Sequence, residues 1–209
     1  GFVLLVLVWF LFAFSSGRNQ SRKIAEHEVK FLGDNNIFIT HESVNNWLIH
    51  NGEPVTNVPK EILNFNGIEN TLTSNAMIKT AAVYVAANGK YRADVIELNP
   101  IARVSTNASY YIDDEGKYMP LSTNYTAHVP IVTGSVEKNN LANIYTIANK
   151  IYNDEFLKTN IIEINQNQNR TLSLKTRVYE CEIELGYVND LNKKINKQKN
   201  KIKKTKLNK

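Results

Sequence analysis

The chain has 209 residues, of which 43% are hydrophobic and 22% are charged, and its formal net charge is +5. This length is enough for one large or two small domains. Because Cys181 is the only cysteine, an internal disulfide and a thiolate metal cluster are excluded, and the fold must depend on apolar cores. Residues 192–209 hold nine lysines and no acid, so the rest of the chain has a charge of −4 (+5 − 9). The basic character belongs to a tail without aromatic residues, which argues against nucleic-acid binding.

The N-terminal residues 1–17 carry no charge and are mostly Leu, Val, Phe and Trp. A membrane helix needs about 20 apolar residues, or about 17 at the short end, so this run is just long enough. We expect a single membrane anchor here; a cleavable signal peptide and a buried core helix are the alternatives. The chain starts with Gly1 and not Met, so we expect the anchor to be truncated, without the upstream charges that would set its topology.

The next segment, residues 24–98, begins with a predicted strand over 24–32. Thr40 is the expected N-cap of a helix that ends near residue 50. A second helix is expected from Asn66, where Glu69 completes a capping-box pattern. Apolar residues at helical spacing are expected to be buried on these two helices: Val44, Trp47, Leu48, Ile68 and Leu72.

Two strands follow, over residues 81–87 and 91–98. They are joined by Asn88-Gly89, which predicts a hairpin because both residues tolerate positive φ. The predicted order is therefore strand, helix, helix, strand, strand.

The second large segment, residues 100–187, is rich in short strands and has one expected helix at about 137–152. A strand at 161–164 and a terminal pair at 172–178 and 180–185 complete it. The turn between the last two lacks Gly and Asn, so one continuous strand is an open alternative. The tail, residues 188–209, has too few apolar residues for a sustained stripe. We expect it to be disordered or a frayed helix and dispensable for folding, with contact to anionic lipid headgroups or to an acidic partner segment as the alternative.

The sequence offers little chemistry. The four histidines are scattered, without metal-ligand spacing, and no Gly-x-Ser-x-Gly motif or phosphate-binding loop is present. Asp113, Asp114 and Glu115 precede Gly116, but the alternating spacing of a calcium loop is missing, so a hairpin turn is favoured. We expect a protein that is not an enzyme, with no cofactor, metal or small-molecule substrate.

The most distinctive sequence segments lie in residues 100–134. They are Pro100-Ile-Ala-Arg-Val, Ser109-Tyr-Tyr-Ile-Asp-Asp-Glu-Gly-Lys-Tyr-Met-Pro-Leu-Ser and His128-Val-Pro-Ile-Val-Thr-Gly. This stretch resembles the extracytoplasmic core of the FtsQ/DivIB cell-division proteins, especially the Bacteroidetes type. The words Phe31-Leu-Gly, Ile37-Phe-Ile-Thr and Ile68-Glu-x-x-Leu are similar to the POTRA sequence of that family.

The resemblance implies an α+β fold with a membrane helix (1–17), a POTRA domain (24–98), a β-domain with one packed helix (100–187) and the Lys-rich tail (188–209). It implies a non-catalytic scaffold of the divisome, anchored in the inner membrane with its body in the periplasm at the division septum. Its partners would be FtsB and FtsL, captured by strand addition to the β-domain edge. The expected partner-binding residues are Arg177, Val178, Cys181, Ile183 and Leu185. The alternative is a POTRA-type chaperone or secretion module that guides unfolded outer-membrane strands.

Overall fold

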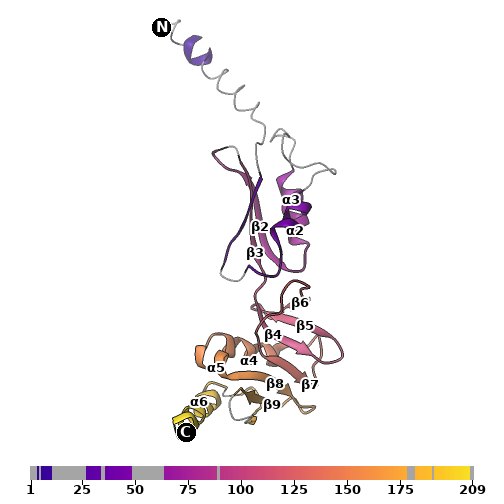
Figure 1. Cartoon of the computed structure of the whole chain (residues 1–209), viewed down its shortest axis with the longest axis vertical. Coiled ribbons are helices and arrows are strands. Elements are labelled where there is room, and N and C mark those ends of the chain that lie inside the picture. The colour runs from indigo at the N-terminus through magenta and orange to yellow at the C-terminus, as the bar shows by residue number, and fades with distance from the viewer. Residues whose placement is uncertain are drawn as a thin grey trace. The chain divides into compact units, whose positions relative to one another are not determined.

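The computed structural model describes residues 4, 6–10, 27–33, 36–48, 64–88, 90–177, 182–189 and 191–207. The chain divides into two compact units, Gly1–Glu97 and Leu98–Lys209 (Figure 1). Residues 4 and 6–10 are helical and expose large apolar side chains. Within the described ranges, no helix is both long and apolar enough to cross a membrane. Most of the predicted anchor, residues 1–17, lies outside those ranges.

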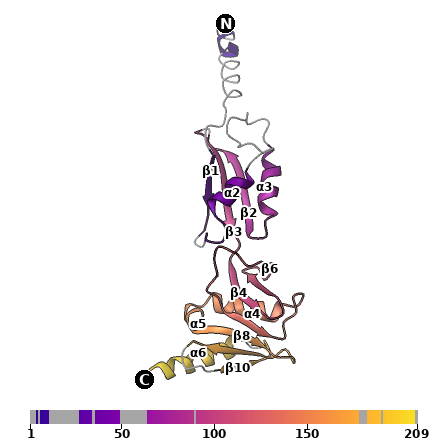
Figure 2. The ribbon, with the colours of Figure 1, turned by 45° about the vertical axis from the view of Figure 1, so that its right-hand side comes forward.

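The first unit has the predicted order of elements. They are β1 (His27–Phe31), α2 (His41–Trp47), α3 (Phe65–Thr73), β2 (Ile78–Val85) and β3 (Tyr91–Glu97). The strand order is β1-β3-β2, in which β1 is parallel and β2 antiparallel to the central β3. Both helices lie on one side of this sheet (Figures 1 and 2). The predicted β2–β3 hairpin is confirmed, although Gly89 itself is outside the described residues.

The two helix starts differ in how well the sequence predicted them. Thr40 is the N-cap of α2, and its hydroxyl accepts a hydrogen bond from the Ser43 amide at 3.1 Å, as expected. The predicted capping box at Asn66 is wrong, because Asn64 caps α3 two residues earlier. Glu69 faces β2 instead, where it accepts from the Val83 amide at 2.6 Å.

The core of the first unit lies between the helices and β3. Its buried side chains include Val44, Leu48, Ile68, Leu72, Tyr91, Ala93 and Val95. Of the expected apolar set, Trp47 is only half-buried. Glu97 is 5% exposed, and its carboxylate accepts hydrogen bonds from the amides of Ile37, Phe38 and Ile39, each at 3.0 Å. This buried acid therefore ties the segment before α2 to the end of β3.

In the part that the structure describes, the second unit is a seven-stranded mixed sheet with three helices, in the strand order β10-β9-β8-β7-β4-β5-β6. The strands are β4 (Pro100–Ser105), β5 (Ser109–Asp113), β6 (Tyr118–Met119), β7 (Ile131–Gly134), β8 (Ile161–Gln166), β9 (Leu172–Thr176) and β10 (Glu182–Gly186). The helices are α4 (Ala142–Tyr152), α5 (Glu155–Asn160) and α6 (Leu191–Leu207). Figure 2 shows β10 at the end of the sheet far from β6.

Alternation along the strands separates the two faces of this sheet. Ile164, Leu174 and Ile183 are neighbours across β8, β9 and β10, and all three are buried in one apolar cluster with residues of α4, α5 and α6. The opposite face is polar at the same strands. The helices therefore cover one face.

Several predictions for this unit can be compared with the elements. The Asp113–Gly116 turn joins β5 and β6 as expected: the Asp113 carboxylate accepts from the Glu115 and Lys117 amides, and Gly116 has a φ of +80°. The terminal strands are two separate antiparallel strands, not one. The short helix α5 was not expected.

The Lys-rich tail forms helix α6. Ile195 is 1% exposed and belongs to the apolar cluster of the second unit. Lys199 contacts Asp154, with 2.6 Å between Nζ and Oδ2. The first half of α6 is therefore attached to the fold.

Candidate partner-binding site

The strand β10 forms one edge of the seven-stranded sheet. It pairs with β9 on one side, and no other described strand pairs with it on the other. An edge strand of this kind directs alternate backbone N–H and C=O groups away from its sheet, where another chain can pair with them. Strand addition is therefore geometrically open at β10.

The side chains of β10 alternate between the two faces of the sheet. Ile183 and Leu185 are 5% and 4% exposed and pack in the apolar cluster. Glu182 and Glu184 are exposed on the opposite face. The two predicted site residues on this strand thus hold the edge in place from inside, and a partner would meet mainly the backbone and the two glutamates.

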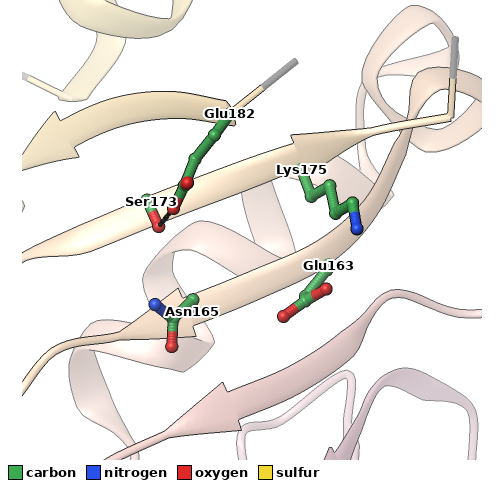
Figure 3. A pocket seen from close by; sticks show the side chains of 5 residues that line it. All are labelled: Glu163, Asn165, Ser173, Lys175 and Glu182. Atoms are coloured by element: carbon green, nitrogen blue, oxygen red, sulfur yellow. Dashed lines mark hydrogen bonds between the residues drawn. The ribbon is translucent and has the colours of Figure 1, made fainter. Parts of the chain in front are cut away.

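The polar face next to β10 has a shallow cavity of about 320 Å³ (Figure 3). Its lining consists of Glu163, Asn165, Ser173, Lys175 and Glu182. Ser173 Oγ lies 2.8 Å from Glu182 Oε1, and Thr133 Oγ1 lies 2.7 Å from Glu163 Oε1. Lys175 is opposite Glu163 on one side and Glu182 on the other. With Glu184 included, carboxylates outnumber cations around this cavity, which suits polar or basic groups of a partner.

Arg177 lies away from this edge. Its amide donates to the carbonyl of Asn160 at 2.7 Å, just after the end of β9. Its side chain is exposed and lines a second cavity, of about 260 Å³, together with Arg103, His128 and Lys158. The predicted residues therefore do not form one cluster: Arg177 belongs to this cavity and Ile183 and Leu185 to β10.

Two of the predicted residues, Val178 and Cys181, lie outside the described residues. Sequence reasoning did not include Arg103 and Lys158 as site residues. Only a weak indication of a role for Arg103 was present in the sequence, namely that it lies within the distinctive 100–134 stretch. Only the sheet topology brings β4, α5 and the end of β9 together.

Among the described residues, no three His, Cys, Asp or Glu side chains gather as metal ligands would. An open sheet edge beside a polar cavity offers a place where another chain can add a strand. A family model described as FtsQ/DivIB, C-terminal related, matches residues 99–209, which is more than half of the chain. The chain therefore belongs to the FtsQ/DivIB-related family. None of the curated proteins matches it.

Membership in this family has consequences for function. It indicates a role in cell division, as a non-catalytic scaffold whose partners are other proteins of the divisome. The matched residues include the 100–134 stretch on which the resemblance was based.

Proposed function

We propose that the chain holds FtsB, in its pair with FtsL, by adding a segment of that pair as an eighth strand beside β10. The observation that carries this proposal is the open edge of β10, which Ile183 and Leu185 fix to the core from within. The scaffold would act in the periplasm at the septum, anchored in the inner membrane by residues 1–17. The exposed apolar helical residues 6–10 support such an anchor.

The first unit is proposed to be the POTRA domain. Its order of strand, helix, helix, strand, strand and its β1-β3-β2 sheet support this assignment. In this proposal the first unit carries no part of the strand-addition site.

The side chains of β10 restrict the sequence of an added strand. Residues that lie next to Ile183 and Leu185 on the helix-covered face would be apolar, and those next to Glu182 and Glu184 would be polar or basic. The proposed partner segment is therefore an alternating strand with few acids.

The backbone pattern identifies which amides are available. The Arg177 amide donates to Asn160, on the β8 side of β9. Alternation along β9 then directs the backbone groups of Leu174 toward β10, where Ile183 lies opposite. The backbone N–H and C=O of Ile183 therefore bond to β9. We expect the backbone amides of Glu182 and Glu184 to point away from β9, toward the open edge.

This pattern gives a sharp test. Glu184→Pro removes an edge amide but no expected β9 ladder bond, and proline is tolerated on edge strands. The matched control, Glu184→Ala, keeps that amide. We expect the purified proline variant to lose at least about tenfold in affinity for the FtsB/FtsL pair, since more than one kcal/mol of backbone hydrogen bonding is removed. The alanine variant should lose less, at most about fivefold, because it removes only the carboxylate and an exposed ion pair contributes less than about 1 kcal/mol.

A Glu184→Pro variant with an unchanged thermal midpoint and unchanged affinity for the pair would contradict strand addition at β10. Ile183 is a poorer probe, because its side chain is in the core and any loss of binding could follow from unfolding.

A further inference from the structure

The cavity that contains Arg177 has an unusual lining. Among the residues that the structure describes, all the titratable side chains in this lining are basic: Arg103, His128, Lys158 and Arg177. They come from β4, the segment before β7, α5 and the end of β9. Gathering these groups is electrostatically unfavourable unless an anion lies among them.

Arg103 gives a second, independent indication. Its amide donates to the Pro130 carbonyl at 2.9 Å, which fixes β4 beside the segment before β7. Its Nε is buried and has no hydrogen-bond partner among the described residues. A buried guanidinium nitrogen without an acceptor shows that the described residues do not fully compensate the charge of Arg103, and an anion in the cavity that Arg103 lines would offset that charge.

The remaining walls restrict the kind of anion. Ile131, which is 45% exposed, and Ile162 add aliphatic surface to the cavity. A free inorganic anion gains nothing from such surface, whereas a glutamate or aspartate side chain in a peptide with apolar neighbours does. The aliphatic walls and the protein partners of the family both favour a peptide.

We propose that this basic cavity binds a carboxylate of an acidic segment of a partner protein, with Arg103, Lys158 and Arg177 as the cationic groups. The cavity is separate from the β10 edge. Its occupant is acidic, whereas the strand that would lie next to Glu182 and Glu184 is polar or basic. The proposal goes beyond strand addition and does not depend on it.

The test uses the full 209-residue chain and two synthetic peptides, acetyl-Val-Glu-Val-Glu-Val-amide and its counterpart with glutamine in place of glutamate. NMR titration would follow the Nε–H signal of Arg103, identified by its loss in Arg103→Lys. We expect the acidic peptide to shift this signal saturably and the glutamine peptide to bind at least about tenfold more weakly, since charge-assisted hydrogen bonds are lost.

Variants locate the effect. Lys158→Glu and Arg177→Glu should each weaken the acidic peptide at least about tenfold. Arg177→Lys should retain most of the affinity, because the charge is kept. Lys197→Glu makes the same charge change on an exposed residue of α6 and should leave binding within about twofold.

Four results would overturn the proposal. They are no shift of the Arg103 signal with the acidic peptide, equal binding of the two peptides, an equal loss in Lys197→Glu, and binding of inorganic phosphate as tight as that of the acidic peptide. The last result would assign the cavity to a small anion. Thermal midpoints of all variants separate loss of binding from loss of folding, and Glu184→Pro should leave this titration unchanged whatever its effect at β10.

Discussion

At the scale of single residues, the backbone conformation at Gly134 explains why the distinctive 100–134 stretch ends in glycine. Its φ is +87°, a region that L side chains rarely adopt. A Cβ at this position would also collide with the carbonyl oxygen of Gln166 and with the Asn165 side chain. The same place is held by two hydrogen bonds, from the Ser135 amide to the Gln166 carbonyl at 2.7 Å and from Gln166 Nε2 to the Ser135 carbonyl at 2.6 Å.

Gly134→Ala should therefore destabilise the second unit by about 2–4 kcal/mol, because strain and a backbone collision act together. Denaturant unfolding measures this loss. The matched control is Gly186→Ala, which also has a positive φ but whose added Cβ would meet only Lys194 Nζ, at an ordinary contact distance of 3.9 Å. It should cost only about 1 kcal/mol. Equal losses in the two variants would show that the collision with Gln166 contributes nothing.

Glu97 gives a prediction for the first unit. Its two carboxylate oxygens accept three backbone hydrogen bonds while the side chain is buried. Glu97→Gln replaces one acceptor oxygen by a donor, so at least one amide loses its partner, at a cost of about 1–3 kcal/mol. The exposed Glu42 offers a control, since Glu42→Gln should stay within about 0.5 kcal/mol. Chemical denaturation of both variants compares them, and a wild-type midpoint for Glu97→Gln would be the contrary result.

At the scale of elements, the attachment of α6 depends on pH. Asp154 caps α5, accepting from the Phe156 and Leu157 amides through Oδ1, and its Oδ2 contacts Lys199 of α6. The hydrogen bond from Lys199 is the main cause that holds the pKa of Asp154 below its ordinary value. A carboxyl with a lowered folded pKa stabilises the fold above its unfolded pKa, and this contribution disappears as the pH falls through the folded pKa.

The wild type should therefore lose α6 protection when the pH falls below about 3.9, the ordinary aspartate pKa. Hydrogen exchange of the α6 amides measures this protection. In Asp154→Asn the protection should already be lower at neutral pH and should lack this acid-dependent loss. If Asp154→Asn lost α6 protection at low pH as the wild type does, the loss would be due to other carboxyl groups.

The tail gives a second prediction about α6. The sequence favoured a tail that is dispensable for folding, but Ile195 is in the core and Lys199 is bound to Asp154. Deletion of residues 192–209 should cost at least about 2 kcal/mol, as expected for a lost buried isoleucine. Deletion of 201–209 keeps both contacts and should cost less than about 0.5 kcal/mol. Urea unfolding midpoints distinguish the two truncated chains. Equal stability of both would show that the whole tail is dispensable for folding.

At the scale of the whole molecule, local patterns predicted the order of elements well. Thr40 predicts the start of a helix, and Asn88 predicts a hairpin. Both features depend on residues that are close together in the sequence. The predictions that were missed depend on length or on distant partners. Six-residue α5 is too short for a helical period to be visible, and Glu69 was assigned to a cap because its partner, Val83, lies 14 residues away.

The candidate site shows the same limit. The alternation of Ile183 and Leu185 with glutamates predicted a strand with one buried face, and the structure has it. No local pattern links Arg103, Lys158 and Arg177, which come together only because β4, α5 and β9 belong to one sheet with its helices. The identity of the family came from the 100–134 stretch, which also lines much of the basic cavity through Arg103 and residues 126–131, whereas the open edge of β10 lies outside that stretch.

The two glutamates of β10 have one more consequence. If two copies of the chain met edge to edge and antiparallel about Ile183, Glu182 of one copy would lie opposite Glu184 of the other, in both halves of the pair. Like charges directly opposite each other in a sheet are destabilising, and charged edge residues are a common protection against aggregation. The open edge of β10 is thus selective by charge: it disfavours a second copy of itself and remains accessible to a strand without acids.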